Sequence, residues 1–143
     1  MNANSENPKI GRMFQELSAE LLSDYFGMEF GIDIAIPIGD PPKSHKFDCA
    51  SEDKKLVAEC KCYTWTETGN IPSAKMGFIN EAVFYMSYLP ADTVKMIIMK
   101  KATHAKRNET LAQYYCRTNL HLLKGVKVFE IDTEIQKITV VKN

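Results

Sequence analysis

The fold of this chain is decided by the stretch KFDCASEDKKLVAECKCY, residues 46–63, which we interpret as two short strands joined by a polar turn. The second strand alternates, and successive side chains of a strand point to opposite faces of a sheet. Glu59 and Lys61 therefore share one face, about 7 Å apart at the backbone. If the two strands pair as a hairpin, Asp48 can reach the same face. The stretch thus predicts two carboxylates and one ammonium group in a small area of a sheet.

The residues before this stretch predict a helix and a third strand. Residues 8–27 carry apolar side chains at spacings of three and four, which is typical of an amphipathic helix. Residues 28–38 alternate with a period of two and predict a strand, and the two prolines within 39–44 mark a loop. Because short connections cannot join parallel neighbours, we expect the three strands to form an antiparallel meander.

The residues after the stretch predict two more helices and three more strands. Residues 72–88 are expected to form a helix, and the apolar run 94–99 a strand buried on both faces. A strand, a crossover helix and a second strand suggest a parallel pair at the centre of the sheet. Residues 106–120 predict the third helix, followed by strands at 126–132 and 137–141. The fold class is therefore mixed α and β, with a central mixed sheet flanked by helices.

Composition limits the organisation of the chain and its partners. With 143 residues, the chain fits one domain spanning residues 1–143. The net charge is zero, from 18 basic and 18 acidic side chains, which argues against strong nonspecific nucleic-acid binding but leaves a local basic patch open. We find no apolar run long enough to span a bilayer and no secretory signal, so we expect a cytoplasmic protein that makes no membrane contact.

The four cysteines leave two interpretations open. In the cytoplasm they are expected to stay reduced and to pack as small apolar residues. Cys49, Cys60 and Cys62 are close in sequence, which also allows a zinc site, but their spacing lacks the turn usual in structural zinc sites. We expect Cys116 to lie in the core.

The acidic face of the hairpin predicts a divalent metal site. Two carboxylates close together repel each other unless a cation lies between them. Mg²⁺, or Mn²⁺ in its place, suits Asp48 and Glu59, with the backbone carbonyl of Cys60 completing the shell. Lys61 would orient or deprotonate the attacking water, or stabilise the charge of the transition state. Glu16 of the first helix is either a further ligand or base, or an ordinary solvated carboxylate.

Asp48, followed after ten residues by Glu59-Cys60-Lys61, resembles the motif of the PD-(D/E)xK nuclease superfamily. That superfamily includes type II restriction enzymes, archaeal Holliday junction resolvases and RecB-type nuclease domains. The resemblance implies a restriction-endonuclease-like αβββαβ core over residues 9 to about 100. It also implies a Mg²⁺-dependent phosphodiesterase in which Asp48 and Glu59 bind the metal and Lys61 lies near the attacking water. A glutamate in the first helix is a further feature of the family and supports Glu16, whereas Phe47 stands where the motif has proline.

These expectations allow three functions. The first is a metal-dependent DNA endonuclease, acting as a homodimer because one small domain offers one active site while cutting a duplex needs two cuts. The alternative is a catalytically inactive module of nuclease fold that binds nucleic acid or another protein, which the neutral charge favours. An enzyme acting on RNA by histidine, tyrosine and lysine chemistry is a third possibility, but we find no such set in register.

Several basic residues are candidates for contacts to phosphates, which carry most of the salt-dependent affinity for nucleic acids. Two of them precede Asp48, and the others lie in the one dense basic segment: His45, Lys46, Lys100, Lys101, Lys106 and Arg107. The alternative for the basic segment is that it is simply the solvated start of a helix. Trp65, just after the motif strand, is expected to stack on a base, to pack at a subunit interface or to pack in the core.

Overall fold

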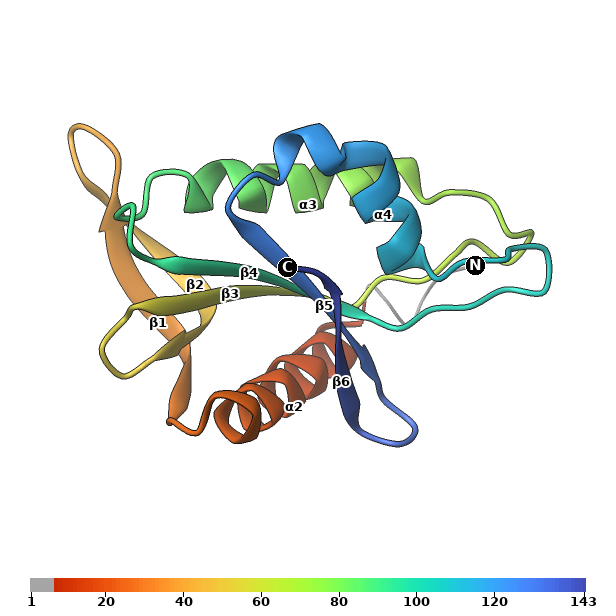
Figure 1. Cartoon of the computed structure of the whole chain (residues 1–143), viewed down its shortest axis with the longest axis horizontal. Helices are drawn as coiled ribbons and strands as arrows, with labels where there is room; N and C mark the ends of the chain where they lie inside the picture. Colours follow the sequence, from red (N-terminus) through yellow and green to blue (C-terminus); the bar gives the residue numbers. More distant parts are fainter. Residues whose placement is uncertain (1–6) are drawn as a thin grey trace.

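The alternating and apolar stretches of the sequence form one six-stranded sheet, whose strands lie in the order in which they occur in the chain (Figure 1). The computed structural model describes residues 7–143. Its elements are α2 (Pro8–Phe26), β1 (Phe30–Ile38), β2 (Lys43–Ser51), β3 (Leu56–Lys61), α3 (Ser73–Met86), β4 (Val94–Lys100), α4 (Leu111–Asn119), the short 3-10 helix η1 (Leu120–Leu122), β5 (Val126–Asp132) and β6 (Lys137–Lys142).

The sheet is mixed, as the sequence predicted. The ladders β1–β2, β2–β3 and β5–β6 are antiparallel, whereas β3, β4 and β5 run parallel to one another. The central strand β4 has four consecutive buried residues, Met96 to Met99, which confirms a strand covered on both faces. None of the described helices is both long and apolar enough to cross a membrane.

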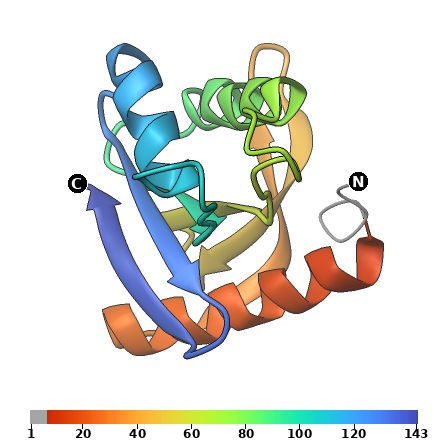
Figure 2. The same cartoon turned by 90° about the vertical axis from the view of Figure 1, so that its right-hand side faces the viewer.

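Helices cover both faces of the sheet (Figure 2). Helix α2 lies on one face, where its buried Phe14 and Leu22 pack in a cluster with apolar side chains of β3, β4 and β5. Helices α3 and α4 cover the opposite face, and their buried side chains, including Ile79 and Tyr115, form the larger cluster. The predicted class of a central sheet flanked by helices is therefore confirmed.

The third helix begins later than the sequence predicted, at Leu111 rather than Lys106. Thr110 Oγ1 accepts a hydrogen bond from the Gln113 N–H at 3.1 Å, and the Gln113 side chain accepts one from the Thr110 N–H at 2.8 Å. This reciprocal capping box satisfies two donors that a helix start otherwise leaves unpaired. The basic residues before it consequently lie in a loop between β4 and α4.

A second boundary also differs from the prediction. Strand β2 starts at Lys43, so the β1–β2 connection is shorter than the predicted loop.

The β1–β2 hairpin bends sharply at Asp33, and this bend positions the functional site. Phe30 and Ile32 pack on the α2 side of the sheet, whereas Ile34 and Ile36 pack on the α3 side. These four residues are spaced two apart, so a regular strand would point all of their side chains to the same face of the sheet. The face to which they point therefore switches between Ile32 and Ile34. Asp33 between them has a φ of 54°, a left-handed conformation that aspartate tolerates better than most residues. The outer half of the hairpin therefore turns towards α3.

Candidate active site

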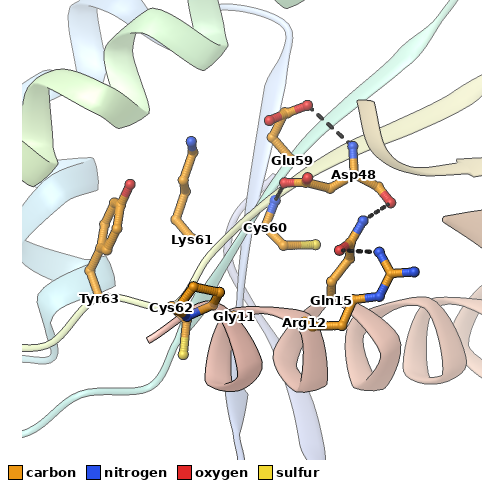
Figure 3. Close-up of a pocket in the computed structure, with 10 residues that line it drawn as sticks. Gly11, Arg12, Gln15, Asp48, Glu59, Cys60, Lys61, Cys62 and Tyr63 are labelled. Atoms are coloured by element: carbon orange, nitrogen blue, oxygen red, sulfur yellow. Dashed lines mark hydrogen bonds between the residues drawn. The ribbon is translucent and has the colours of Figure 1, made fainter. Parts of the chain in front are cut away.

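Strands β2 and β3 separate where the hairpin bends, and side chains replace the missing ladder hydrogen bonds. The two strands are in register only at Cys49–Ala58 and Ala50–Val57. Beyond these pairs, the Asp48 N–H donates to Glu59 Oε1 at 3.3 Å. The Cys60 N–H donates to Asp48 Oδ2 at 2.8 Å (Figure 3). The two carboxylates predicted from the sequence are thus held together by the backbone of the opposite strand.

Burial and mutual repulsion both act on these carboxylates. Only 7% of Glu59 is exposed, and burial, followed by the nearby Asp48 carboxylate, raises the pKa of Glu59 to about 8. Burial also raises the pKa of Asp48. The positive charge of Lys61 opposes both shifts without cancelling them. Glu59 therefore retains a proton at neutral pH when no cation lies between the two groups.

The oxygen atoms at this point fit a small divalent cation. Mg²⁺ uses one or two protein carboxylates and keeps several waters, so Asp48 and Glu59 could hold it, while the part of the Cys60 carbonyl stays a prediction. The raised pKa values are what such a site has before a cation displaces the proton. Residues 7–143 contain no group of three histidine, cysteine, aspartate or glutamate side chains arranged to hold a metal, so the site would depend on substrate or water for the remaining ligands.

The carboxylates open into a pocket of about 480 Å³ between the first turns of α2 and the end of β3. Lys61 and Tyr63 line it, and both point to the α3 side of the sheet together with Glu59 (Figure 3). Burial raises the pKa of Tyr63 to about 12, so its hydroxyl stays protonated and can donate a hydrogen bond. The pocket thus combines two acids, an amine and a hydroxyl donor in one place.

Gln15, a residue that the sequence pattern did not single out, fixes the position of the Asp48 backbone. Gln15 Nε2 donates to the Asp48 carbonyl oxygen and to Asp33 Oδ1, at 2.9 Å in each case. Arg12 donates to the other oxygen of Asp33 at 2.6 Å, which lowers the pKa of Asp33. Helix α2 and the hairpin bend are tied together by these bonds. One signal was available in the sequence, because Gln15 lies next to Phe14 on the apolar side of the helix.

Glu16 is not brought to the acidic pair by the structure. Its side chain is 59% exposed and lies 3.7 Å from Arg12 one turn earlier in the helix. It lines a different cavity, between α2 and the β5–β6 turn. Gln15, one position earlier, contacts the Asp48 strand instead, because that side of α2 faces the sheet.

His45 is the one predicted phosphate contact that lies against the carboxylates. Its Nε2 is 3.8 Å from Glu59 Oε1, and its ring stacks on Tyr85 of α3 with the centroids 4.6 Å apart. Burial lowers the pKa of His45, so the ring is neutral at pH 7 and is not the cation of an ion pair. Lys46, the next residue, has an exposed side chain close enough to Asp33 to lower its pKa.

The basic segment lies apart from the acidic pair, and part of it is engaged in loop packing. Arg107 Nε donates to the Gly69 carbonyl at 2.8 Å, and its guanidinium lies 4.4 Å from the ring centroid of Trp65. Trp65 is 5% exposed and donates to the Ala102 carbonyl, so it packs in the core. The side chains of Lys101 and Lys106 are exposed, and their role as phosphate contacts stays a prediction, as does that of the half-buried Lys100.

The cysteines lie mostly on the α2 side of the sheet. All four are free thiols, and Cys49 and Cys116 are buried. The sulfur atoms of Cys49 and Cys60 are 3.7 Å apart, and neither points towards the carboxylates, because Cys60 lies on the opposite face from Glu59. Cys62 is half-buried at the edge of the pocket.

Replacing Gln15 with methionine tests its link to Asp48. Methionine keeps the length of the side chain and removes both donors, leaving the Asp48 carbonyl without this partner. We expect the free energy of unfolding to fall by about 1–3 kcal/mol, measured by urea denaturation. Glu16→Gln, at the adjacent exposed position, is the matched control and should unfold like the wild type. Equal stability of Gln15→Met and wild type would contradict the role of this bond.

Comparisons with known proteins give no assignment. No family model matches the chain, and neither the curated proteins nor the solved structures contain a match.

Proposed function

We propose that this chain is a Mg²⁺-dependent nuclease of the PD-(D/E)xK type that hydrolyses phosphodiester bonds in DNA. The observation that carries the proposal is the pairing of the Asp48 and Glu59 carboxylates where β2 and β3 separate, with Lys61 on the same face. Holding two buried acids together costs free energy in an empty site. Binding of a divalent cation offsets that cost, which explains why a chain would keep this arrangement.

Each group of the pocket has a role in that reaction. Asp48 and Glu59 would hold Mg²⁺, which polarises a phosphoryl oxygen and lowers the pKa of a bound water. Lys61 places its ammonium beside the water and the phosphate, where it orients the nucleophile and stabilises the negative charge that develops. The protonated hydroxyl of Tyr63 supplies a further hydrogen bond to a phosphate oxygen.

The same site requires a second copy of the chain for double-strand cleavage. One pair of carboxylates serves one phosphodiester bond at a time. We infer that a homodimer would cut both strands of a duplex, whereas a single copy would leave a nick.

Nicking of supercoiled plasmid DNA tests the proposal. We expect purified protein to convert supercoiled plasmid to the open circle in the presence of Mg²⁺ or Mn²⁺, because the oxygen donors of the site suit both ions. An excess of chelator should abolish the reaction, as monitored by gel electrophoresis. Cleavage that persists in chelator would overturn the metal-dependent mechanism. Absence of cleavage with either ion, on duplex, single-stranded and branched DNA, would favour the inactive binding module.

A further inference from the structure

The bend of the β1–β2 hairpin leaves a cavity between the hairpin and α3, next to the pocket of the acidic pair. The outer half of the hairpin rises alongside the carboxyl end of α3 (Figure 1). Between them lies a space of about 460 Å³, which we call the hairpin cleft. Its volume is within the range typical of sites for small organic ligands. Its polar and aromatic lining residues are Asp40, Lys43, Ser44, His45, Phe84, Tyr85 and Tyr88.

One wall of the hairpin cleft is aromatic and unusually exposed. Phe84 of α3 and Tyr88 just after the helix are 59% and 52% exposed, and their rings contact each other edge to face with the centroids 5.4 Å apart. Exposed clusters of large apolar side chains commonly mark binding surfaces. The opposite wall, formed by the hairpin, carries the polar side chains of Asp40, Lys43 and Ser44 beside the apolar Ile38 and Pro41. The cleft therefore suits a flat ring with polar atoms on its edge.

His45 connects the hairpin cleft to the catalytic carboxylates. It lines the cleft, stacks on Tyr85, and places Nε2 3.8 Å from Glu59 Oε1. The imidazole ring also contacts the Phe47 ring edge to face with the centroids 4.5 Å apart, so it continues the aromatic surface of the cleft towards the carboxylates. A ring bound in the cleft would consequently adjoin the phosphate group at Asp48 and Glu59.

We propose that the hairpin cleft binds an unpaired nucleobase next to the scissile phosphate, so that the preferred substrate is single-stranded DNA or a duplex that is locally unpaired at the cut, such as a strained segment of a supercoiled plasmid. This inference rests on the proposed nuclease function. A duplex keeps its bases stacked inside and cannot offer one to the cleft unless a nucleotide is extruded. Single strands, in contrast, bind through stacking on aromatic side chains.

The charge of the chain agrees with this substrate. The 18 basic and 18 acidic side chains cancel, whereas tight duplex binding usually depends on many contacts from a basic surface to phosphates. Stacking needs no net charge, and removal of one aromatic partner typically weakens binding by about 5- to 100-fold per base. The cleft thus supplies affinity that the neutral surface does not.

Binding of a labelled oligothymidylate in chelator tests the inference without requiring cleavage. By fluorescence anisotropy, wild type should bind this probe more tightly than a strand of equal length built from abasic units, and more tightly than a duplex. Phe84→Ala should weaken oligothymidylate binding by about 5- to 100-fold and leave binding of the abasic strand unchanged. Phe84 is largely exposed, so the variant should keep its fold, which circular dichroism will check.

Phe78→Ala is the matched control, because Phe78 is a 48% exposed aromatic residue of the same helix that does not line the cleft. It should bind oligothymidylate like the wild type. Equal binding by Phe84→Ala and wild type, or equal affinity of wild type for oligothymidylate and abasic strand, would overturn the inference. So would a change of Phe84→Ala from dimer to monomer with unchanged binding, since the aromatic wall would then be a contact between copies.

The plasmid assay with Mg²⁺ separates this inference from the proposed function. If wild type nicks DNA while Phe84→Ala binds normally, the nuclease function stands and the nucleobase site is wrong. If wild type neither cuts nor binds any nucleic acid, both are wrong.

Discussion

Lys61→Ala will lower the rate of plasmid nicking by about 10²- to 10⁴-fold, the usual effect of removing one group that acts on the transition state. Lys61 is the cation on the same sheet face as the Asp48 and Glu59 carboxylates, and it lines their pocket. Its ammonium would act on the attacking water and on the charge of the phosphate. The fold should remain intact, because the side chain is only half-buried at the end of β3. The rate is measured by gel densitometry and the fold by circular dichroism.

Lys55→Ala is the control for this change. Lys55 is exposed just before the same strand, and its ammonium group lies 3.7 Å from the Asp92 carboxylate on the surface. We expect its nicking rate to equal that of the wild type. Nicking by Lys61→Ala at the wild-type rate would remove Lys61 from the mechanism.

Lys61→Arg distinguishes the two roles that the sequence left open. Arginine keeps the positive charge but cannot lose its proton under physiological conditions. Substantial activity in Lys61→Arg would indicate that the charge stabilises the transition state. Activity as low as in Lys61→Ala would indicate proton transfer or a strict need for the lysine geometry.

Glu59→Gln will abolish nicking and, without metal, will make the protein more stable at alkaline pH. Between the ordinary glutamate pKa of 4.5 and about 8, folded Glu59 holds a proton that the unfolded chain has released. The free energy of unfolding of the wild type must therefore fall as the pH rises through this window. Glutamine keeps the oxygen that accepts the Asp48 N–H and carries no charge. We expect Glu59→Gln to exceed the wild type by about 2–4 kcal/mol at pH 8.5 and to match it near pH 4.5.

Urea unfolding in chelator at several pH values measures this difference. Glu52→Gln, at an exposed position in the β2–β3 turn, is the control and should follow the wild type. A variant Glu59→Gln that is less stable than wild type at pH 8.5 would indicate a structural ion pair with Lys61 instead. Titration calorimetry with Mg²⁺ completes the test, because wild type should release or absorb heat on binding and Glu59→Gln should bind far more weakly.

Most of the fold followed from the periodicity of the sequence. The apolar stripe of α2, the apolar run Met96 to Met99 of β4 and the alternation of β3 each have one plausible way of being buried. Boundaries were less well determined. The run of basic residues before α4 has good helix formers, and only the reciprocal bonding of Thr110 and Gln113 fixes the start of the helix at Leu111.

The candidate site was predicted in part. Alternation alone placed Glu59 and Lys61 on one face, since residues two apart in a regular strand point to the same side of the sheet. Gln15 and Glu16 are adjacent polar residues, and the rotation of α2 about its axis decides which of the two side chains faces the sheet. That rotation is set by packing of Phe14 and Leu22 on the sheet, so Gln15 meets the Asp48 strand and Glu16 meets solvent.

The sequence by itself determined the order of the elements and the acid, acid and lysine set, because both depend on local spacing. Only the tertiary structure decided that Asp48 faces Glu59 and that a cleft lies beside them. Both result from the left-handed conformation of Asp33, which makes the hairpin change face and separate from β3. Arg12 and Gln15, eighteen or more residues away in the chain, hold Asp33 at that bend. The contacts of Arg12 and Gln15 with Asp33 join distant parts of the chain, so they cannot be predicted from a local sequence pattern. They form only when helix α2 packs against the sheet.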